Sequence, residues 1–279
     1  MKAIAAGVTR TFKASTVVSV LVALLAAAAI ILPSHVFAEE APSRQPTVVL
    51  VHGAFAESSS WNGVITRLLA KGYPVIAVAN PLRGVKSDAD YVGSVIDSVH
   101  GSVVLVGHSY GGNVISNAAT GRKSVKALVF VSGVAPDVGE SASSLVAKFP
   151  GSTLGGTLAP PVLLPGGGKD IYILQDKYHA QFAADVSDTD SQWMAATQGP
   201  ITDAALNEPS GVPAWKTVPS WFLYGSLDKN IPPAVHAFMA QRAHARKAVE
   251  VKGASHVVMI SHPDALVKLI DEAAAATTR

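Results

Sequence analysis

The feature that most constrains the fold of this chain is the alternation of short apolar segments with segments of helical periodicity. The apolar segments, rich in β-branched residues, lie at 47–51, 74–79, 102–106, 125–132, 220–224 and 248–252. Helical patterns separate or follow them at 60–70, 89–99, 112–120, 233–243 and 263–275. Nearly continuous apolar strands that alternate with helices are typical of a parallel sheet covered on both faces. The sequence therefore predicts an α/β fold with a mostly parallel, doubly wound sheet and helices on both of its faces.

The last helical pattern carries a start signal. Ser261 precedes Pro263 and Asp264, which favours an N-cap at Ser261 and a helix whose first turn contains the proline. Leu266, Leu269 and Ile270 then share one helical face.

The first 38 residues resemble a bacterial-type signal peptide. Lys2, Arg10 and Lys13 precede an apolar stretch at 17–32, and Ala38 fits a cleavage site before Glu39. The apolar stretch is shorter than the roughly 20 residues that a membrane span needs, although an uncleaved membrane anchor is the alternative. We expect an exported protein, periplasmic or secreted, with a mature chain of residues 39–279 and no stable membrane association after cleavage.

The charge and cysteine content exclude several classes of function. The chain has 22 basic and 20 acidic residues, and three of the basic ones lie in the leader, so the rest is close to neutral. No basic run with interleaved aromatic residues occurs, and nucleic-acid binding is therefore not expected. The chain has no cysteine, which excludes disulfides, a thiolate nucleophile and thiolate metal ligands.

The alternation of strands and helices stops at about 137–215. This segment contains glycine- and proline-rich stretches at 151–168, with helical patterns at 170–184 and near 192–196. Its aromatic side chains are too apolar for free solvent, so we expect a small inserted cap that folds over the carboxyl edge of the sheet.

A Gly107-His108-Ser109-Tyr110-Gly111 pentapeptide lies between an apolar strand and a helical pattern. The sequence G-x-S-x-G alone is a weak signal, but at a junction from strand to helix it is typical of a sharp turn that exposes a nucleophilic serine. Ser109 is the candidate nucleophile.

The loop after the first strand is the candidate for stabilising negative charge. Gly53 allows close approach of the backbone to a ligand, and the amide N–H of Ala54 is placed to face an oxyanion. Paired with the N–H of Tyr110, the residue after Ser109, it makes a two-donor oxyanion hole. Donors of this kind contribute about 3 kcal/mol each to the transition state.

A base and an orienting acid follow at later strand ends. His256 lies on the short loop after the last strand, and imidazole both accepts and returns a proton near neutral pH. Asp228, just after the strand at 220–224, is the candidate acid, and Asp137 is its rival. The chain order favours Asp228, because the acid lies between nucleophile and base in Ser…Asp…His enzymes. No close spacing of metal ligands occurs, so neither a metal nor another cofactor is expected.

Four strand-end motifs together resemble the α/β-hydrolase superfamily: Val49-Leu50-Val51-His52-Gly53-Ala54-Phe55, Val106-Gly107-His108-Ser109-Tyr110-Gly111-Gly112, Gly225-Ser226-Leu227-Asp228 and Gly253-Ala254-Ser255-His256. The resemblance covers nearly all of the chain after the leader except the cap, and is nearest to the small single-domain branch of methyl esterases, hydroxynitrile lyases and exported bacterial esterases. It implies Ser109, Asp228 and His256 as a catalytic triad and Ala54 and Tyr110 as oxyanion donors. The chain departs from the larger family in lacking obvious strands before Thr47, so we expect a sheet of about six principal strands.

The function expected from these residues is hydrolysis of small to medium uncharged carboxylic esters through an acyl-enzyme. Phe55, Trp193 and Met194 are the candidate lining of the substrate pocket. A hydroxynitrile lyase, a cofactor-free haloperoxidase or perhydrolase, and a hydrolase-like ligand-binding receptor remain alternatives with the same triad. The sequence does not define an oligomeric state.

Overall fold

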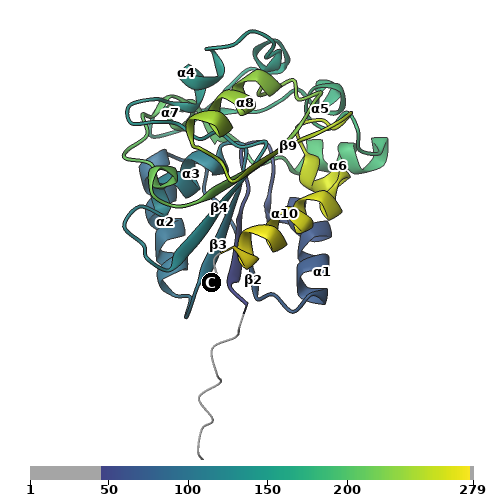
Figure 1. Cartoon of the computed structure of the whole chain (residues 1–279). Coiled ribbons are helices and arrows are strands. Elements are labelled where there is room, and N and C mark those ends of the chain that lie inside the picture. Colours follow the sequence, from purple (N-terminus) through teal and green to yellow (C-terminus); the bar gives the residue numbers. More distant parts are fainter. Residues whose placement is uncertain (1–44, 277–279) are drawn as a thin grey trace, which may run out of the picture. The chain divides into compact units, whose positions relative to one another are not determined.

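The computed structural model describes residues 45–276, which are built around one mostly buried parallel sheet (Figure 1). Its six strands run in the order β2-β1-β3-β4-β8-β9, and every pairing between neighbours is parallel. The strands are β1 (Thr47–Val51), β2 (Val75–Val78), β3 (Val103–His108), β4 (Val125–Val131), β8 (Ser220–Gly225) and β9 (Lys247–Val251). All residues of the central strands β1, β3 and β8 are buried, which explains their unbroken apolar sequences.

Helices cover both faces of this sheet, as the alternation predicted. Helices α1 (Asn62–Ala70) and α10 (Pro263–Ala275) pack against each other on one face, and α2 (Val85–Asp97) and α3 (Gly111–Ala118) do so on the other (Figure 1). Helix α8 (Pro233–Arg242) connects β8 to β9 and contacts both strands. Parallel strands are joined by right-handed crossovers. From β1 the chain moves outward to β2, then returns past β1 to β3 and continues across the sheet in the opposite direction, so the connecting helices lie on both faces. The α/β fold class predicted from the sequence is confirmed.

The start of α10 corrects one expectation. His262, not Ser261, occupies the N-cap position, and no side chain caps the helix. Ser261 instead ends the short helix α9 (Val258–Ser261), and its hydroxyl contacts the His262 ring. Pro263 is the first residue of α10, because a residue with no N–H group costs nothing there.

The segment between β4 and β8 folds at the carboxyl ends of the strands, above the sheet in Figure 1. It contains α4 (Ala142–Val146), a 3-10 turn (Leu154–Thr157), a small antiparallel sheet of β5 (Val162–Leu163), β6 (Lys169–Ile171) and β7 (Ile201–Thr202), and helices α5 (Gln175–Phe182), α6 (Asp188–Thr197) and α7 (Asp203–Asn207). The helix predicted at 170–184 begins only at Gln175, because the residues before it pair in β6.

Specific polar contacts fasten this segment to the main sheet and its connections. The Arg83 guanidinium lies 2.6 Å from the Asp170 carboxylate, and the backbone N–H of Thr202 donates to the carbonyl of Leu82. The Tyr178 hydroxyl donates to the carbonyl of Phe55 at 2.6 Å. These contacts fix the segment over the strand ends, where α/β sheets bind their ligands.

The leader predicted at residues 1–38 lies outside the described residues. Within residues 45–276, no helix has the length and apolar character needed to cross a membrane.

Candidate active site

Ser109 lies on a strained turn between β3 and α3. Its φ of +53° is in the left-handed region, which a residue with a side chain adopts only when the surroundings enforce it. A Cβ on Gly107 would lie 2.6 Å from the carbonyl oxygen of Gly111, and one on Gly111 would lie 2.5 Å from that of Val51. The two glycines are therefore required by close backbone approach, and the turn holds the Ser109 side chain at the end of the sheet.

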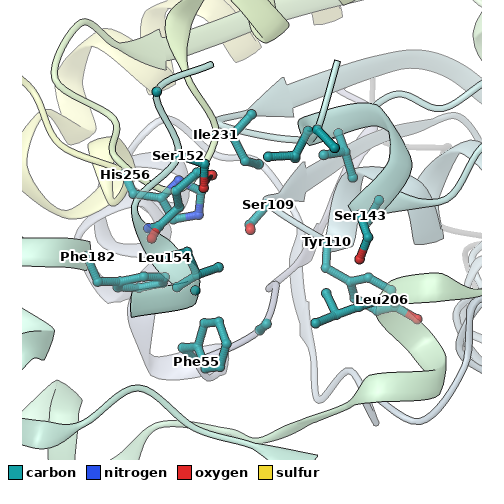
Figure 2. Close-up of a pocket in the computed structure, with 18 of the residues that line it drawn as sticks. Phe55, Ser109, Tyr110, Ser143, Ser152, Leu154, Phe182, Leu206, Ile231 and His256 are labelled. Carbon is teal, nitrogen blue, oxygen red and sulfur yellow. Dashed lines mark hydrogen bonds between the residues drawn. The ribbon is translucent and has the colours of Figure 1, made fainter. Parts of the chain in front are cut away.

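His256 and Asp228 form a buried pair beside this turn. The His256 Nδ1 atom lies 2.7 Å from Oδ2 of Asp228, and both side chains are almost completely buried. The carboxylate accepts the Nδ1 proton, so the lone pair of the imidazole is on Nε2. That atom has no hydrogen-bond partner among the described residues. His256 and Ser109 line the same cavity (Figure 2), so Nε2 is free to accept a proton from a group in that cavity.

The turn after β8 holds the Asp228 carboxylate in one orientation. Its Oδ1 atom accepts the backbone N–H groups of Asn230 and Ile231, each at 2.9 Å. Its Oδ2 atom faces His256 and is therefore reserved for imidazole. The backbone donors therefore hold Oδ1, and Oδ2 faces the His256 ring.

Electrostatic contacts keep Asp228 ionised. Burial by itself would raise the pKa of this carboxyl group, but the neighbouring His256 and His236 and their hydrogen bonds outweigh burial. The net effect lowers the pKa of Asp228 below its ordinary value, so the group remains a carboxylate across the pH range in which imidazole changes its charge.

His236 is a partner of Asp228 that the sequence did not reveal. His236 is fully buried and its Nε2 atom lies 3.3 Å from Asp228 Oδ2. Its ring stacks on Tyr224 with centroids 4.9 Å apart. Burial is the largest influence on His236 and lowers its pKa, and it outweighs the Asp228 carboxylate, which acts to raise it, so the ring is a neutral donor to the carboxylate. The available signal was its place in the first turn of α8, the helix that follows the Asp228 turn.

Removing this donor is expected to change the pH profile of catalysis. In His236→Leu the carboxylate loses a hydrogen bond and binds the imidazolium form of His256 more strongly. The acid limb of the kcat/KM profile should therefore move to higher pH, whereas His236→Gln, which keeps an amide donor, should stay near the wild type. Profiles of kcat/KM against pH for the three proteins measure this. Equal shifts in both variants would contradict a donor role. The other ionisable groups near this pair are His108 and Tyr224.

The two proposed oxyanion donors are adjacent. A Cβ on Gly53 would lie 2.6 Å from Cβ of Ser109 and 3.0 Å from the backbone nitrogen of Tyr110. The loop that carries Ala54 therefore touches the turn that carries Ser109, the candidate nucleophile. Within the described part of the chain, neither the N–H of Ala54 nor that of Tyr110 has a hydrogen-bond partner, whereas the N–H of Phe55 donates to Gly199. Both residues border the cavity, so the two free donors are available to a ligand there.

Two further buried histidines shape these loops. His52 Nδ1 lies 3.0 Å from the carbonyl oxygen of Gly53, and its Nε2 accepts the backbone N–H of Asn80. His108 Nε2 lies 3.3 Å from the carbonyl oxygen of His256. Burial lowers the pKa of both rings, and His256 adds to the effect at His108. Both are therefore neutral structural groups.

The cavity above Ser109 has a volume of about 440 Å³ and an apolar lining. Figure 2 shows several of its wall residues around the Ser109 hydroxyl. Its apolar wall includes the side chains of Phe55, Val146, Phe149, Leu154, Phe182 and Leu206. None of the described residues that line it is an aspartate, glutamate, lysine or arginine. The site therefore suits an uncharged ligand of moderate size.

Only one of the three predicted pocket residues lines the cavity above Ser109. Phe55 lines the cavity, but Trp193 and Met194 lie on α6 and border a separate surface groove. Trp193 is 67% exposed. Helix α6 covers the outside of the segment, and the wall of the cavity comes instead from α4, the loop at 149–155 and α5.

The structure also separates the two candidate acids. Asp137 forms a half-exposed ion pair with Lys216, which lowers the pKa of Asp137, and it makes no contact with His256. Asp228 is the carboxylate that contacts His256. Among the described residues no cluster of three or more metal-ligating side chains occurs.

Comparison with known proteins places the chain in a family. Residues 48–269 match the alpha/beta hydrolase family, and the chain belongs to it. It is 26% identical to alpha/beta hydrolase nvfD of Aspergillus novofumigatus over 82% of this chain and 97% of that protein. It is also 26% identical to an alpha-hydroxynitrile lyase of Arabidopsis thaliana over 84% and 98% of the two chains. Among solved structures, polyneuridine aldehyde esterase has a TM-score of 0.70 at 21% identity, covering 82% of this chain and 98% of that one.

Proposed function

We propose that the protein is a serine esterase that hydrolyses small to medium uncharged carboxylic esters through an acyl-enzyme. The observation that carries this proposal is the buried His256–Asp228 pair, whose free Nε2 atom shares a cavity with Ser109 on its strained turn. A serine beside an oriented imidazole is the arrangement that nucleophilic acyl transfer requires.

The proposed reaction has two steps. Ser109 Oγ attacks the ester carbonyl while His256 Nε2 takes its proton, and the Ala54 and Tyr110 amides stabilise the oxyanion. His256 then returns the proton to the leaving alcohol, which leaves an acyl-serine. His256 Nε2 then takes a proton from water, which adds to the acyl carbon. The bond from the acyl carbon to Ser109 Oγ breaks, His256 returns the proton to Oγ, and the acid is released. Asp228 keeps the Nδ1 proton in place and stabilises the imidazolium in both steps.

The lining of the cavity supports the preference for uncharged esters. A charged acyl chain would enter a wall of Phe149, Leu154 and Leu206 with no countercharge, and an unpaired buried charge is costly. A neutral chain gains apolar contacts with the same wall.

A matched pair of substrates tests this preference. We expect kcat/KM for p-nitrophenyl hemisuccinate to be about 100-fold below that for p-nitrophenyl butyrate, equivalent to about 2.7 kcal/mol. The two acyl groups have the same number of carbons and differ mainly in one carboxylate. Equal rates would contradict an uncharged substrate class, and turnover of neither ester by the wild type would contradict the esterase proposal itself.

A hydroxynitrile lyase is the second candidate, because one relative that covers most of this chain bears that name. The absence of a charged side chain from the described cavity lining favours ester hydrolysis, since a basic group would assist the departing cyanide. Assay of cyanide release from mandelonitrile, run beside the ester panel, separates the two. Haloperoxidase or perhydrolase activity is tested by adding peroxide, and a ligand-binding receptor would bind esters with little turnover.

Export is a further part of the proposal, and it rests on the leader sequence at residues 1–38. Expression of the full chain in a bacterial host, followed by mass measurement of the periplasmic protein, tests it. A mass that corresponds to an N-terminus at Glu39 supports export with cleavage, and a full-length product in the membrane fraction contradicts it.

A further inference from the structure

A second buried carboxylate, that of Asp88 on α2, contacts Tyr110, one of the two proposed oxyanion donors. Its side chain has no exposure to solvent, and its Oδ2 atom accepts the Tyr110 hydroxyl at 3.0 Å. Among the described residues no basic side chain forms an ion pair with Asp88. A buried carboxylate with no countercharge is costly, so every hydrogen bond to it matters.

The donors to Asp88 come from backbone and hydroxyl groups. The N–H of Arg83 lies 3.1 Å from each carboxylate oxygen, and the Ser87 hydroxyl lies 3.4 Å from Oδ1. Burial is the largest influence and raises the pKa of Asp88, while these donors and the Tyr110 hydroxyl act against it. The phenol is thus one of a small set of groups that offset the burial of this charge.

Tyr110 connects this carboxylate to the reacting atoms through its backbone. The residue directly follows Ser109, and its phenol points away from the serine hydroxyl (Figure 2). Its carbonyl accepts the N–H groups of Asn113 and Val114 in the first turn of α3. The residue borders the cavity and is fixed at its carbonyl and at its hydroxyl, while its own N–H has no partner among the described residues.

The first residues of α2 are also held by a carboxylate from the segment between β4 and β8. The Glu208 carboxylate accepts the N–H groups of Val85 and Lys86, at 2.6 and 3.1 Å. Glu208 follows α7, the helix whose Leu206 lines the cavity. Helix α2 is thus fixed to the wall of the cavity and presents Asp88 to Tyr110.

We propose that Asp88 is a positioning residue for the oxyanion hole: its carboxylate holds the Tyr110 phenol and thereby sets the direction of the Tyr110 backbone N–H. The proposal rests on the proposed esterase function. Asp88 does not touch the substrate, and its effect on the reaction passes through the side chain and backbone of Tyr110. Loss of the hydroxyl should loosen the donor without removing it.

Tyr110→Phe provides the direct test. We expect kcat to fall about 10-fold with KM within about two-fold, less than the 10²–10³-fold loss that follows removal of a whole oxyanion donor. Binding of a trifluoromethyl ketone, whose adduct with Ser109 carries an oxyanion, should weaken by a similar factor. Binding of the corresponding secondary alcohol, which forms no adduct, should not change. An unchanged kcat, or equal weakening of both ligands, would overturn the proposal.

Asp88→Asn and the double variant test whether the two residues act together. We expect Asp88→Asn to lower kcat, and the double variant to match Tyr110→Phe within about two-fold, because residues that act through one contact are not additive. If the two single losses multiply in the double variant, Asp88 acts independently of the phenol and the proposal fails.

Tyr73→Phe is the matched control. Tyr73 is a buried tyrosine whose hydroxyl interacts with Asp271. It lies before the start of β2, whereas Ser109 follows the end of β3, so the two residues are at opposite ends of the parallel strands. Burial and Asp271 raise the pKa of Tyr73 to about 12. This variant should keep the wild-type kcat, and a fall equal to that of Tyr110→Phe would assign the effect to general loosening. If the wild type neither hydrolyses esters nor binds the trifluoromethyl ketone, the esterase proposal fails with it; normal wild-type turnover with an unaffected Tyr110→Phe overturns the positioning role alone.

Discussion

Ser109→Ala is expected to lower kcat for ester hydrolysis by roughly 10⁶-fold, the order of loss found when the nucleophile of a serine triad is removed. The strained turn presents one hydroxyl to the cavity that also contains the free Nε2 atom of His256. Alanine leaves the turn, the base and the cavity in place but offers no atom that forms an ester bond. Steady-state assays on p-nitrophenyl butyrate measure the loss.

Covalent labelling supplies an independent reading of the same variant. A serine-directed fluorophosphonate should label the wild type at Ser109 and leave Ser109→Ala unlabelled, as determined by peptide mass spectrometry. Ser94→Ala, which changes a serine on the outer part of α2, is the control and should label normally. Retained labelling of Ser109→Ala at another serine would show that the nucleophile has been assigned to the wrong residue.

Asp228→Asn is expected to lower kcat by roughly 10⁴-fold with little change in folding. The reason lies in the two backbone N–H groups, of Asn230 and Ile231, that point at Oδ1. They will bind the amide oxygen of an introduced asparagine, so its NH₂ group will face His256. The imidazole must then accept at Nδ1 and carry its proton on Nε2, which is the wrong tautomer for a base toward Ser109.

Asp137→Asn is the control for this prediction. Asp137 pairs with Lys216 and makes no contact with His256. The kcat of the Asp137→Asn variant should therefore stay within about two-fold of the wild type. Circular dichroism and thermal unfolding of both variants establish that each is folded. A larger loss of kcat in Asp137→Asn than in Asp228→Asn would transfer the role of the acid to Asp137.

Much of the framework could be predicted from the sequence because it depends on short-range patterns. The strand predicted at 47–51 coincides with β1, and the helix predicted at 263–275 coincides with α10. The turn at Ser109 was also visible, since two glycines at fixed offsets are required wherever backbone segments approach so closely. Local periodicity and turn chemistry carry this information within about ten residues.

The segment at 137–215 was less predictable. Its helices and strands are short, so periodicity is weak, and the helical pattern at 170–184 extends over residues that form the strand β6. Trp193 was expected inside because it is large and apolar, yet it is 67% exposed on α6. The inner face of such a segment depends on how it docks onto the rest of the molecule, and no short-range signal reports that.

Patterns of neighbouring residues were sufficient to predict the class of fold, the turn that carries Ser109 and the order of serine, acid and histidine along the chain. The tertiary structure decided which carboxylate meets His256, brought His236 to the same oxygen, and placed Asp88 beneath Tyr110. The physical reason is that hydrogen bonds between residues distant in the chain depend on the packing of helices and strands. Only the folded chain brings such donors and acceptors within hydrogen-bonding distance of one another.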